Sequence, residues 1–278
     1  MAGCQSGKDR TKSITRNTAI LVASFGTSYN ENRVLTIGAI EEDITKAFSV
    51  YEMRRAFTSQ IIIDKLKKRD GLEIDNVEEA LERAVKDNVE NLVVQPTLLM
   101  DGYEYMDLVN ALKDYEDKFN QVIIGAPLLS SDADFDAVVK AITDKTSSYD
   151  DRQTAICFMG HGTEADFNGV YSKLQEKLKS AGFDNYYIGT VKAEPTLDDV
   201  MASLKEKGSY KRVVLEPLMV VAGGHATNDM AGDEDDSWKT ILKGKGYEVE
   251  CLLEGLGQVE AIRNIYVAHT QAAFDSLK

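Results

Sequence analysis

The feature that most constrains the fold is a regular alternation of strand-like and helix-like segments. Short, continuously apolar runs alternate with amphipathic stretches along the 278 residues, the pattern of an α/β protein with parallel sheets. The run at 18–24 (TAILVAS) is apolar throughout, so we expect a strand buried on both faces. In the first half the sequence predicts further strands at 52–57, 91–96 and 121–126, and helices at 31–47, 59–68, 76–87 and from about residue 104.

The second half of the chain repeats the first. Thr18-Ala19-Ile20 is matched by Thr154-Ala155-Ile156, and LVVQP at 92–96 is matched by VVLEP at 213–217. Two matches in the same order predict two similar Rossmann-like domains with parallel sheets flanked by helices. We place them at 18–140 and 141–278, after a flexible tether at 1–17, with the active-site cleft between them.

Two of the three histidines follow apolar strands in glycine-lined turns. His161 lies in FMGHGT and His225 in VVAGGHA. A parallel sheet presents residues at the carboxyl ends of its strands to ligands, and Gly162 and Gly224 leave room for close approach. The pattern favours imidazoles that bind a metal or accept a proton. The alternative is a strand-end histidine bonded to a backbone carbonyl, which is less convincing for two histidines than for one.

The repeat adds a carboxylate to this pair. Glu104 and His225 each lie eight residues beyond a matched proline, whereas His161 corresponds to Phe25. Two imidazoles and one carboxylate suit a divalent first-row metal and leave room for a substrate. As an alternative, Glu104 is an acid placed favourably at a helix N-terminus. We expect the substrate to contact the following residues: Phe25, Thr27, Ser28, Gly162 and Gly224.

Composition excludes several other functions. A formal charge of −14 argues against a nucleic-acid partner, and no apolar run approaches the ~20 residues of a membrane span. The sequence also lacks a G-x-S-x-G elbow, a complete G-x-G-x-x-G and a Walker loop, so hydrolase, dinucleotide and nucleoside-triphosphate functions have no support.

Cys4 differs from the other two cysteines. It stands in Met1-Ala2-Gly3-Cys4 before a polar stretch, which resembles the processed end of a bacterial lipoprotein. This pattern predicts an exported protein with a lipid anchor at Cys4, and an apolar signal segment upstream of Ala2 in the native gene. A free cysteine in a flexible tail of a cytoplasmic protein is the alternative.

The chain after residue 17 resembles the anaerobic sirohydrochlorin cobaltochelatases, relatives of the ferrochelatases among the class II chelatases. The resemblance is carried by segments that are weak singly but specific together and in order. They are SFGTS at 24–28, RAFTS at 55–59, RDG at 69–71, PLLS at 127–130, MGHG at 159–162, AGGH at 222–225, NDMA at 228–231 and DSWK at 236–239.

This resemblance implies insertion of Co²⁺ into sirohydrochlorin, with release of two protons, in cobalamin (vitamin B12) biosynthesis and without an organic cofactor. It implies catalytic and metal-binding roles for His161, His225 and Glu104, although Asp101 and Met106 beside Glu104 depart from the usual pattern. We expect His161 to be the proton acceptor. Insertion of Fe²⁺ or Ni²⁺ stays open, as does a non-catalytic lipoprotein that carries metal or tetrapyrrole. A periplasmic-type binding protein ranks last, and a homo-oligomer also stays open.

An anionic substrate must be bound locally by a protein with this net charge. We expect backbone N–H groups at Thr27 and Ser28 and around Thr163 to contribute. Arg54 or Arg55 is a candidate charge partner, and alternation along their strand would direct only one of them to the substrate.

Overall fold

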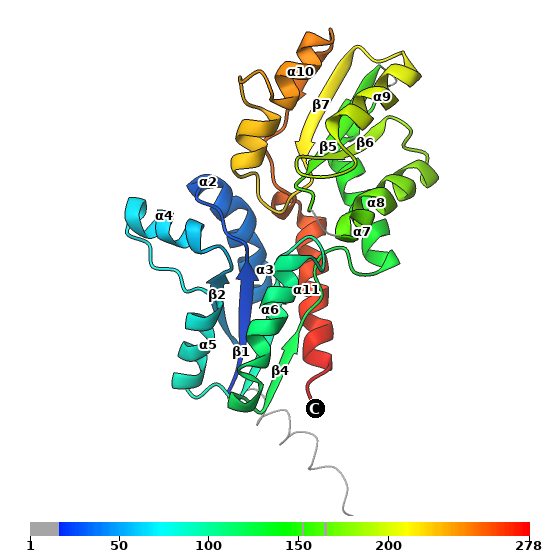
Figure 1. Cartoon of the computed structure of the whole chain (residues 1–278). Coiled ribbons are helices and arrows are strands. Elements are labelled where there is room, and N and C mark those ends of the chain that lie inside the picture. The colour runs from blue at the N-terminus through cyan, green and yellow to red at the C-terminus, as the bar shows by residue number, and fades with distance from the viewer. Residues whose placement is uncertain (1–16, 152, 164–165) are drawn as a thin grey trace, which may run out of the picture. The chain divides into compact units, whose positions relative to one another are not determined.

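The computed structural model describes residues 17–151, 153–163 and 166–278 (Figure 1). Contacts divide this part of the chain into two compact units. Unit 1 contains residues 17–28, Ile37–Leu128 and Asn264–Lys278, and unit 2 contains Tyr29–Thr36 and Leu129–Arg263. The predicted anchor Cys4 lies outside the described residues.

Each unit contains one four-stranded parallel sheet. The sheet of unit 1 has the order β2-β1-β3-β4, from β1 (Thr18–Ser24), β2 (Glu52–Phe57), β3 (Asn91–Pro96) and β4 (Gln121–Ile124). The sheet of unit 2 has the order β6-β5-β7-β8, from β5 (Thr154–Gly160), β6 (Tyr186–Thr190), β7 (Arg212–Pro217) and β8 (Glu248–Cys251). The same strand order twice confirms the predicted α/β class and the internal repeat.

The central strands of the two sheets also share a register. Thr18, the first residue of β1, pairs with Asn91, the first of β3. Thr154 and Arg212 pair in the same way at the start of β5 and β7. All residues of β1 and of β5 are buried, as their continuous apolar sequences predict.

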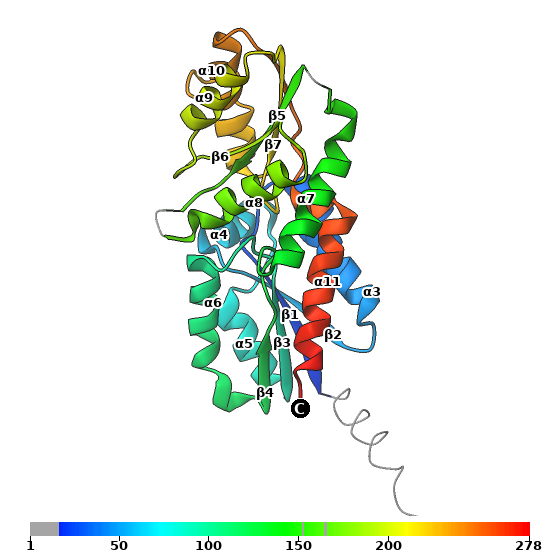
Figure 2. The same cartoon turned by 90° about the vertical axis from the view of Figure 1, so that its right-hand side faces the viewer.

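Helices cover both faces of the sheet in unit 1 (Figures 1 and 2). One face packs on α5 (Val77–Lys86) and α6 (Tyr103–Lys113), which bury Leu81 and Leu108 among its apolar residues. The opposite face lies against α3 (Ala39–Ala47) and α11 (Glu260–Asp275), and Phe48 after α3 stacks on Phe274 of α11 with ring centroids 5.0 Å apart. Helix α4 (Gln60–Asp70) follows β2, and a 3₁₀ turn (Glu116–Lys118) precedes β4.

Unit 2 is built in the same way. One face of its sheet packs on α9 (Leu197–Lys207) and α10 (Trp238–Gly244), and the other on α7 (Asp132–Thr146) and α8 (Gly169–Ser180). Its shorter elements are α2 (Asn30–Arg33), 3₁₀ turns at Ser147–Tyr149, Asp166–Asn168 and Leu256–Gln258, and a π-helical turn at His225–Met230. The predicted helix at 31–47 is α2 and α3 joined by a π-helical segment, Val34–Gly38.

The units do not follow the predicted division at residue 140. That position lies inside α7, whose start is fixed by a capping box between Ser131 and Asp134. The last part of α11 belongs to unit 1, where Tyr266 donates a hydrogen bond to the Leu98 carbonyl at 3.1 Å. Apolar periodicity locates a helix but does not show which sheet it covers.

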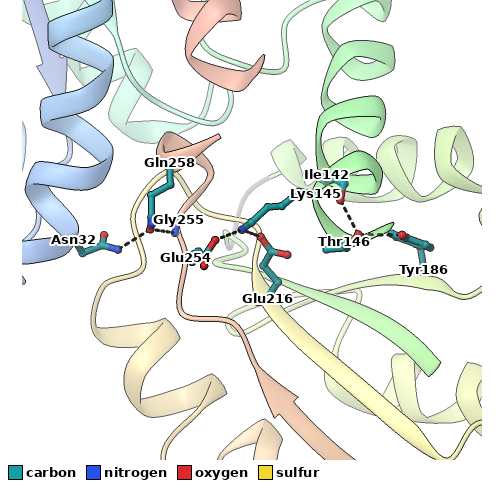
Figure 3. Close-up of polar contacts among 9 residues, drawn as sticks. All are labelled: Asn32, Ile142, Lys145, Thr146, Tyr186, Glu216, Glu254, Gly255 and Gln258. Carbon is teal, nitrogen blue, oxygen red and sulfur yellow. Dashed lines mark hydrogen bonds and ion pairs between the residues drawn. The ribbon is translucent and has the colours of Figure 1, made fainter. Parts of the chain in front are cut away.

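Equivalent buried polar residues link these two helices to their sheets. Gln95 of β3 accepts a hydrogen bond from Thr270 of α11 at 3.2 Å. Glu216, at the same place in β7, is fully buried and forms an ion pair with Lys145 of α7 (Figure 3). Lys145 also lies 3.1 Å from Glu254. Helix α7 therefore holds the same place in unit 2 that α11 holds in unit 1.

Within the described residues, no helix combines the length and the apolar character needed to cross a membrane.

We expect Lys145→Met to lower the free energy of unfolding by about 3–5 kcal/mol, because it leaves the Glu216 carboxylate buried and uncompensated. In urea denaturation, the double variant with Lys145→Met and Glu216→Gln should regain most of the free energy of unfolding that Lys145→Met loses. Burial raises the pKa of Glu216, and Lys145 opposes this rise. Without Lys145, the folded variant should bind a proton at Glu216 more readily than the unfolded chain does. Stability of the single variant should therefore increase as the pH falls towards the ordinary carboxyl range. A deficit that is independent of pH would contradict this account.

Candidate functional site

The structure brings His161 and His225 together in unit 2. His161 is the first residue after β5, and His225 follows the loop that leaves the neighbouring strand β7. Their ring centroids are 4.8 Å apart, with an angle of 66° between the ring planes. With metal–nitrogen bonds of about 2.1 Å, two imidazoles on one ion have centroids roughly 5 Å apart. The pair therefore has the separation of two ligands of one metal ion.

A carboxylate orients the ring of His225. Its Nδ1 lies in a short contact with Oδ2 of Asp229, four residues later in the π-helical turn. An ionised carboxylate only accepts, so Nδ1 carries the proton and the lone pair lies on Nε2. Metal-binding histidines commonly donate their other N–H to such a carboxylate, which fixes the tautomer and strengthens the ligand.

His161 has the same tautomer for a different reason. Its Nδ1 lies 2.7 Å from the carbonyl oxygen of Gly162, which can only accept a hydrogen bond. Nδ1 is again the donor, and the lone pair lies on Nε2. This backbone contact is the one expected of a structural histidine, so the evidence for function is the second imidazole beside it.

The turn that carries His161 is tightly packed. Gly162 has a φ of 76°, and a Cβ at this position would lie 2.5 Å from Oγ1 of Thr190. Its N–H donates to the hydroxyl of Tyr171 at 3.1 Å, and Lys192 N–H donates to the His161 carbonyl at 2.9 Å. Packing and backbone conformation together require glycine at 162.

Gly224 is different. Its φ of −56° is open to any residue, and a Cβ there would meet only the Asn228 amide at 3.9 Å. Neither packing nor backbone conformation requires glycine beside His225. The open space is consistent with the predicted approach of a ligand to this ring.

Glu104 lies in unit 1, as the second residue of α6 after its N-cap Gly102. Its side chain is exposed, with no hydrogen bond or ion pair to another described residue. Among the residues that the structure describes, no group of three or more histidine, cysteine, aspartate or glutamate side chains could hold a metal ion. The two histidines lie together, and the role of Glu104 as a third metal ligand stays a prediction.

The repeat places Phe25 and His161 at equivalent positions, each directly after a seven-residue strand. Phe25 is 46% exposed and presents an aromatic ring at the carboxyl end of β1. Thr27 and Ser28 are buried, and a contact of their backbone N–H groups with substrate stays a prediction.

Other expected anion contacts are already used within the protein. Arg54 pairs with Glu52 at 2.9 Å and Asp87 at 2.8 Å, and Arg55 pairs with the buried Glu41. The Thr163 N–H donates to Oδ1 of Asn168 at 3.0 Å. Each of these groups thus has a partner within the protein, and their contact with a substrate carboxylate stays a prediction.

Unit 1 contains a cavity of about 1170 Å³, and neither His161 nor His225 lines it. It is bounded by residues of β2, α4 and α5, and acids and bases both line it. It contains no histidine and none of Phe25, Thr27, Ser28, Gly162 and Gly224, although Arg54 and Arg55 line it. The cavity therefore does not coincide with the histidine pair.

Comparison with known proteins identifies the relationship. The model of the cobalt chelatase (CbiK) family matches residues 18–275. The chain belongs to this family. A sirohydrochlorin cobaltochelatase of Salmonella typhimurium is 36% identical and covers 92% of this chain and 96% of its own length. The sirohydrochlorin cobaltochelatase CbiKC of Nitratidesulfovibrio vulgaris is 32% identical and covers 93% and 91%.

Solved structures show the same fold at low identity. SirB from Bacillus subtilis with Fe³⁺ has a TM-score of 0.64 at 14% identity and covers 92% of this chain and 95% of its own. CbiX, described as the terminal enzyme of siroheme biosynthesis in denitrifying bacteria, has a TM-score of 0.55 at 14% identity and covers 94% and 100%. The resemblance predicted from the sequence motifs is thus confirmed for the family and the fold.

Sequence analysis missed Asp229, the carboxylate that orients His225 in this member of the cobalt chelatase family. The signal was present, because Asp229 lies four residues after the histidine and such residues share one face of a helix. The π-helical backbone that brings them together was not predictable from this spacing alone.

The two glycines should respond differently to a methyl group. Gly162→Ala should lose about 1–3 kcal/mol of stability, because its φ and its contacts exclude a Cβ. Gly224→Ala should keep or slightly raise its melting temperature, yet slow metal insertion about tenfold, a barrier change of about 1.4 kcal/mol. Melting curves and chelatase rates measure both. A fully active Gly224→Ala protein would show that no ligand approaches this position.

Proposed function

We propose that this protein is a sirohydrochlorin cobaltochelatase, which inserts Co²⁺ into sirohydrochlorin in cobalamin biosynthesis. The observation that carries the proposal is the histidine pair, with centroids 4.8 Å apart, within a chain matched to the cobalt chelatase family over residues 18–275. The names of the two relatives, both sirohydrochlorin cobaltochelatases, support the choice of tetrapyrrole and metal.

The reaction defines what the protein must supply. The ring takes up Co²⁺ and loses the protons of two pyrrole N–H groups, so charge and atoms balance when two protons leave. An imidazole can bind the ion or accept a proton through Nε2, but one lone pair cannot do both at once. Two imidazoles allow these tasks to be divided.

We assign metal binding first to His225. Its contact with Asp229 provides the carboxylate–histidine arrangement that supports a metal ligand. His161, held by a neutral carbonyl, shares the ion while it is bound and accepts a proton once its Nε2 lone pair is released. Glu104 would complete the ligand set. An incomplete shell suits a chelatase, because the ion must pass to the ring rather than stay on the protein.

Turnover separates this proposal from the carrier alternative. Anaerobic absorbance of sirohydrochlorin with Co²⁺, with and without catalytic amounts of protein, should show many turnovers to the metallated ring. A carrier would bind without multiple turnover. Parallel reactions with Fe²⁺ and Ni²⁺ would show which ion is inserted fastest.

The lipid anchor at Cys4 and a homo-oligomer remain predictions from the sequence.

We expect His161→Ala and His225→Ala each to reduce chelatase activity at least about 100-fold, the loss typical of a removed acid–base group, with little change in melting temperature. His269→Ala is the matched control, since this third histidine lies in α11 and its Nδ1 contacts the Ala126 carbonyl at 3.1 Å. If His269→Ala were the damaging change and the other two neutral, the assignment of the site would be wrong.

Glu104→Gln distinguishes a ligand from a helix-capping acid. As a ligand, Glu104 should be needed for cobalt affinity, because the substitution keeps shape but removes charge. Thermal stability should then be nearly unchanged. If Glu104 acts only on the dipole of α6, stability should fall by about 0.3–1 kcal/mol while cobalt affinity stays intact. Calorimetric cobalt titration and a melting curve on this variant decide between the two.

A further inference from the structure

The loop that carries His225 leaves β7 at Pro217 and has no regular structure before residue 224. Its position must therefore be set by contacts with other segments. The Met219 and Val220 carbonyls accept hydrogen bonds from the N–H groups of Leu256 and Gly257, at 2.8 Å and 3.0 Å. These contacts leave the N–H of Ala222, three residues before His225, to be satisfied elsewhere.

A side chain from a distant part of the sequence satisfies it. Oδ1 of Asn32, on α2, accepts a hydrogen bond from the Ala222 N–H at 2.9 Å. Nδ2 of Asn32 lies 3.5 Å from Oε1 of Gln258, which also accepts from the Gly255 N–H at 3.1 Å. Figure 3 shows Asn32 directed at Gln258, with Gly255 beside it. One amide thus contacts both segments that form the base of the His225 loop.

The two segments approach each other closely. A Cβ on Gly255 would lie 2.5 Å from the Val220 carbonyl oxygen and 2.9 Å from the Ala222 nitrogen. Gly255 is preceded by Glu254, which pairs with Lys145 of α7 at 3.1 Å. The segment against which the His225 loop rests is therefore itself fixed to a core helix of unit 2.

We propose that Asn32 is a positioning residue for His225. Its acceptor oxygen holds the backbone at Ala222 and so sets where the imidazole stands relative to His161. Asn32 acts through the loop and does not itself bind metal. The inference rests on the proposed function, because it concerns the geometry of the same histidine pair.

The experiment compares three variants and one reference by Co²⁺ titration without tetrapyrrole, followed by the visible absorption of the bound ion. Asn32→Ala removes the acceptor and should weaken Co²⁺ binding about tenfold and change the intensity of the cobalt bands. Asn32→Asp keeps an acceptor oxygen for Ala222 and should restore binding to within about threefold of the unaltered protein.

Asn185→Ala is the matched control within unit 2. The Asn185 amide bonds Asp150 at 2.8 Å and the Thr154 carbonyl at 3.2 Å, at the amino-terminal end of the sheet. It should lower the melting temperature and leave Co²⁺ binding unchanged. If Asn32→Ala binds Co²⁺ normally, if Asn32→Asp fails to rescue it, or if both alanine variants lose affinity alike, the positioning role is overturned.

His225→Ala is the reference that separates the two proposals. If it abolishes Co²⁺ binding while Asn32→Ala does not weaken it, only the inference about Asn32 fails. If His225→Ala binds Co²⁺ as well as the unaltered protein, the proposed metal site itself fails, and the role of Asn32 with it.

Discussion

The pairing of the two central strands in each sheet is the constraint on which the rest of this structure depends. In unit 2, β5 and β7 are parallel and in register from their first residues, so their carboxyl ends lie side by side. Loops that begin at these two adjacent strand ends start close together, so their side chains can come into contact. The contact between His161 and His225 follows from this pairing, since each histidine is supplied by one of the two loops.

Most of the fold was predictable because these central strands are continuously apolar. The predicted bounds of β1, β2 and β3 agree with the structure, and the second parallel sheet that the repeat predicted is present. The helix assignments to the units were not predictable. Whether α11 covers one sheet or the other depends on contacts such as Thr270 with Gln95, between residues far apart in sequence.

The candidate site was predictable in part. Strand-end position and flanking glycines were sufficient to find both histidines, because parallel sheets place such residues at one edge. Asp229 and Asn32 were missed, since each acts through an irregular backbone, a π-helical turn in one case and a loop in the other. The charge of Arg54 and Arg55 suggested them as substrate contacts, but charge alone does not reveal the carboxylates with which they pair in the structure.

The repeat also shows how one architecture can carry two kinds of chemistry. The residue directly after the first strand of each unit is followed by a glycine of positive φ. This residue is Phe25 in unit 1 and His161 in unit 2. Eight residues beyond the matched prolines stand Glu104 and His225. The equivalent backbone positions thus present an aromatic ring and a carboxylate in unit 1, and two imidazoles in unit 2. A metal chelatase needs a surface for a flat macrocycle as well as ligands and a base. Because both sheets share a strand order, the different chemistry proposed for the two units depends on side-chain identity at a few strand-end positions and on the contacts that orient them.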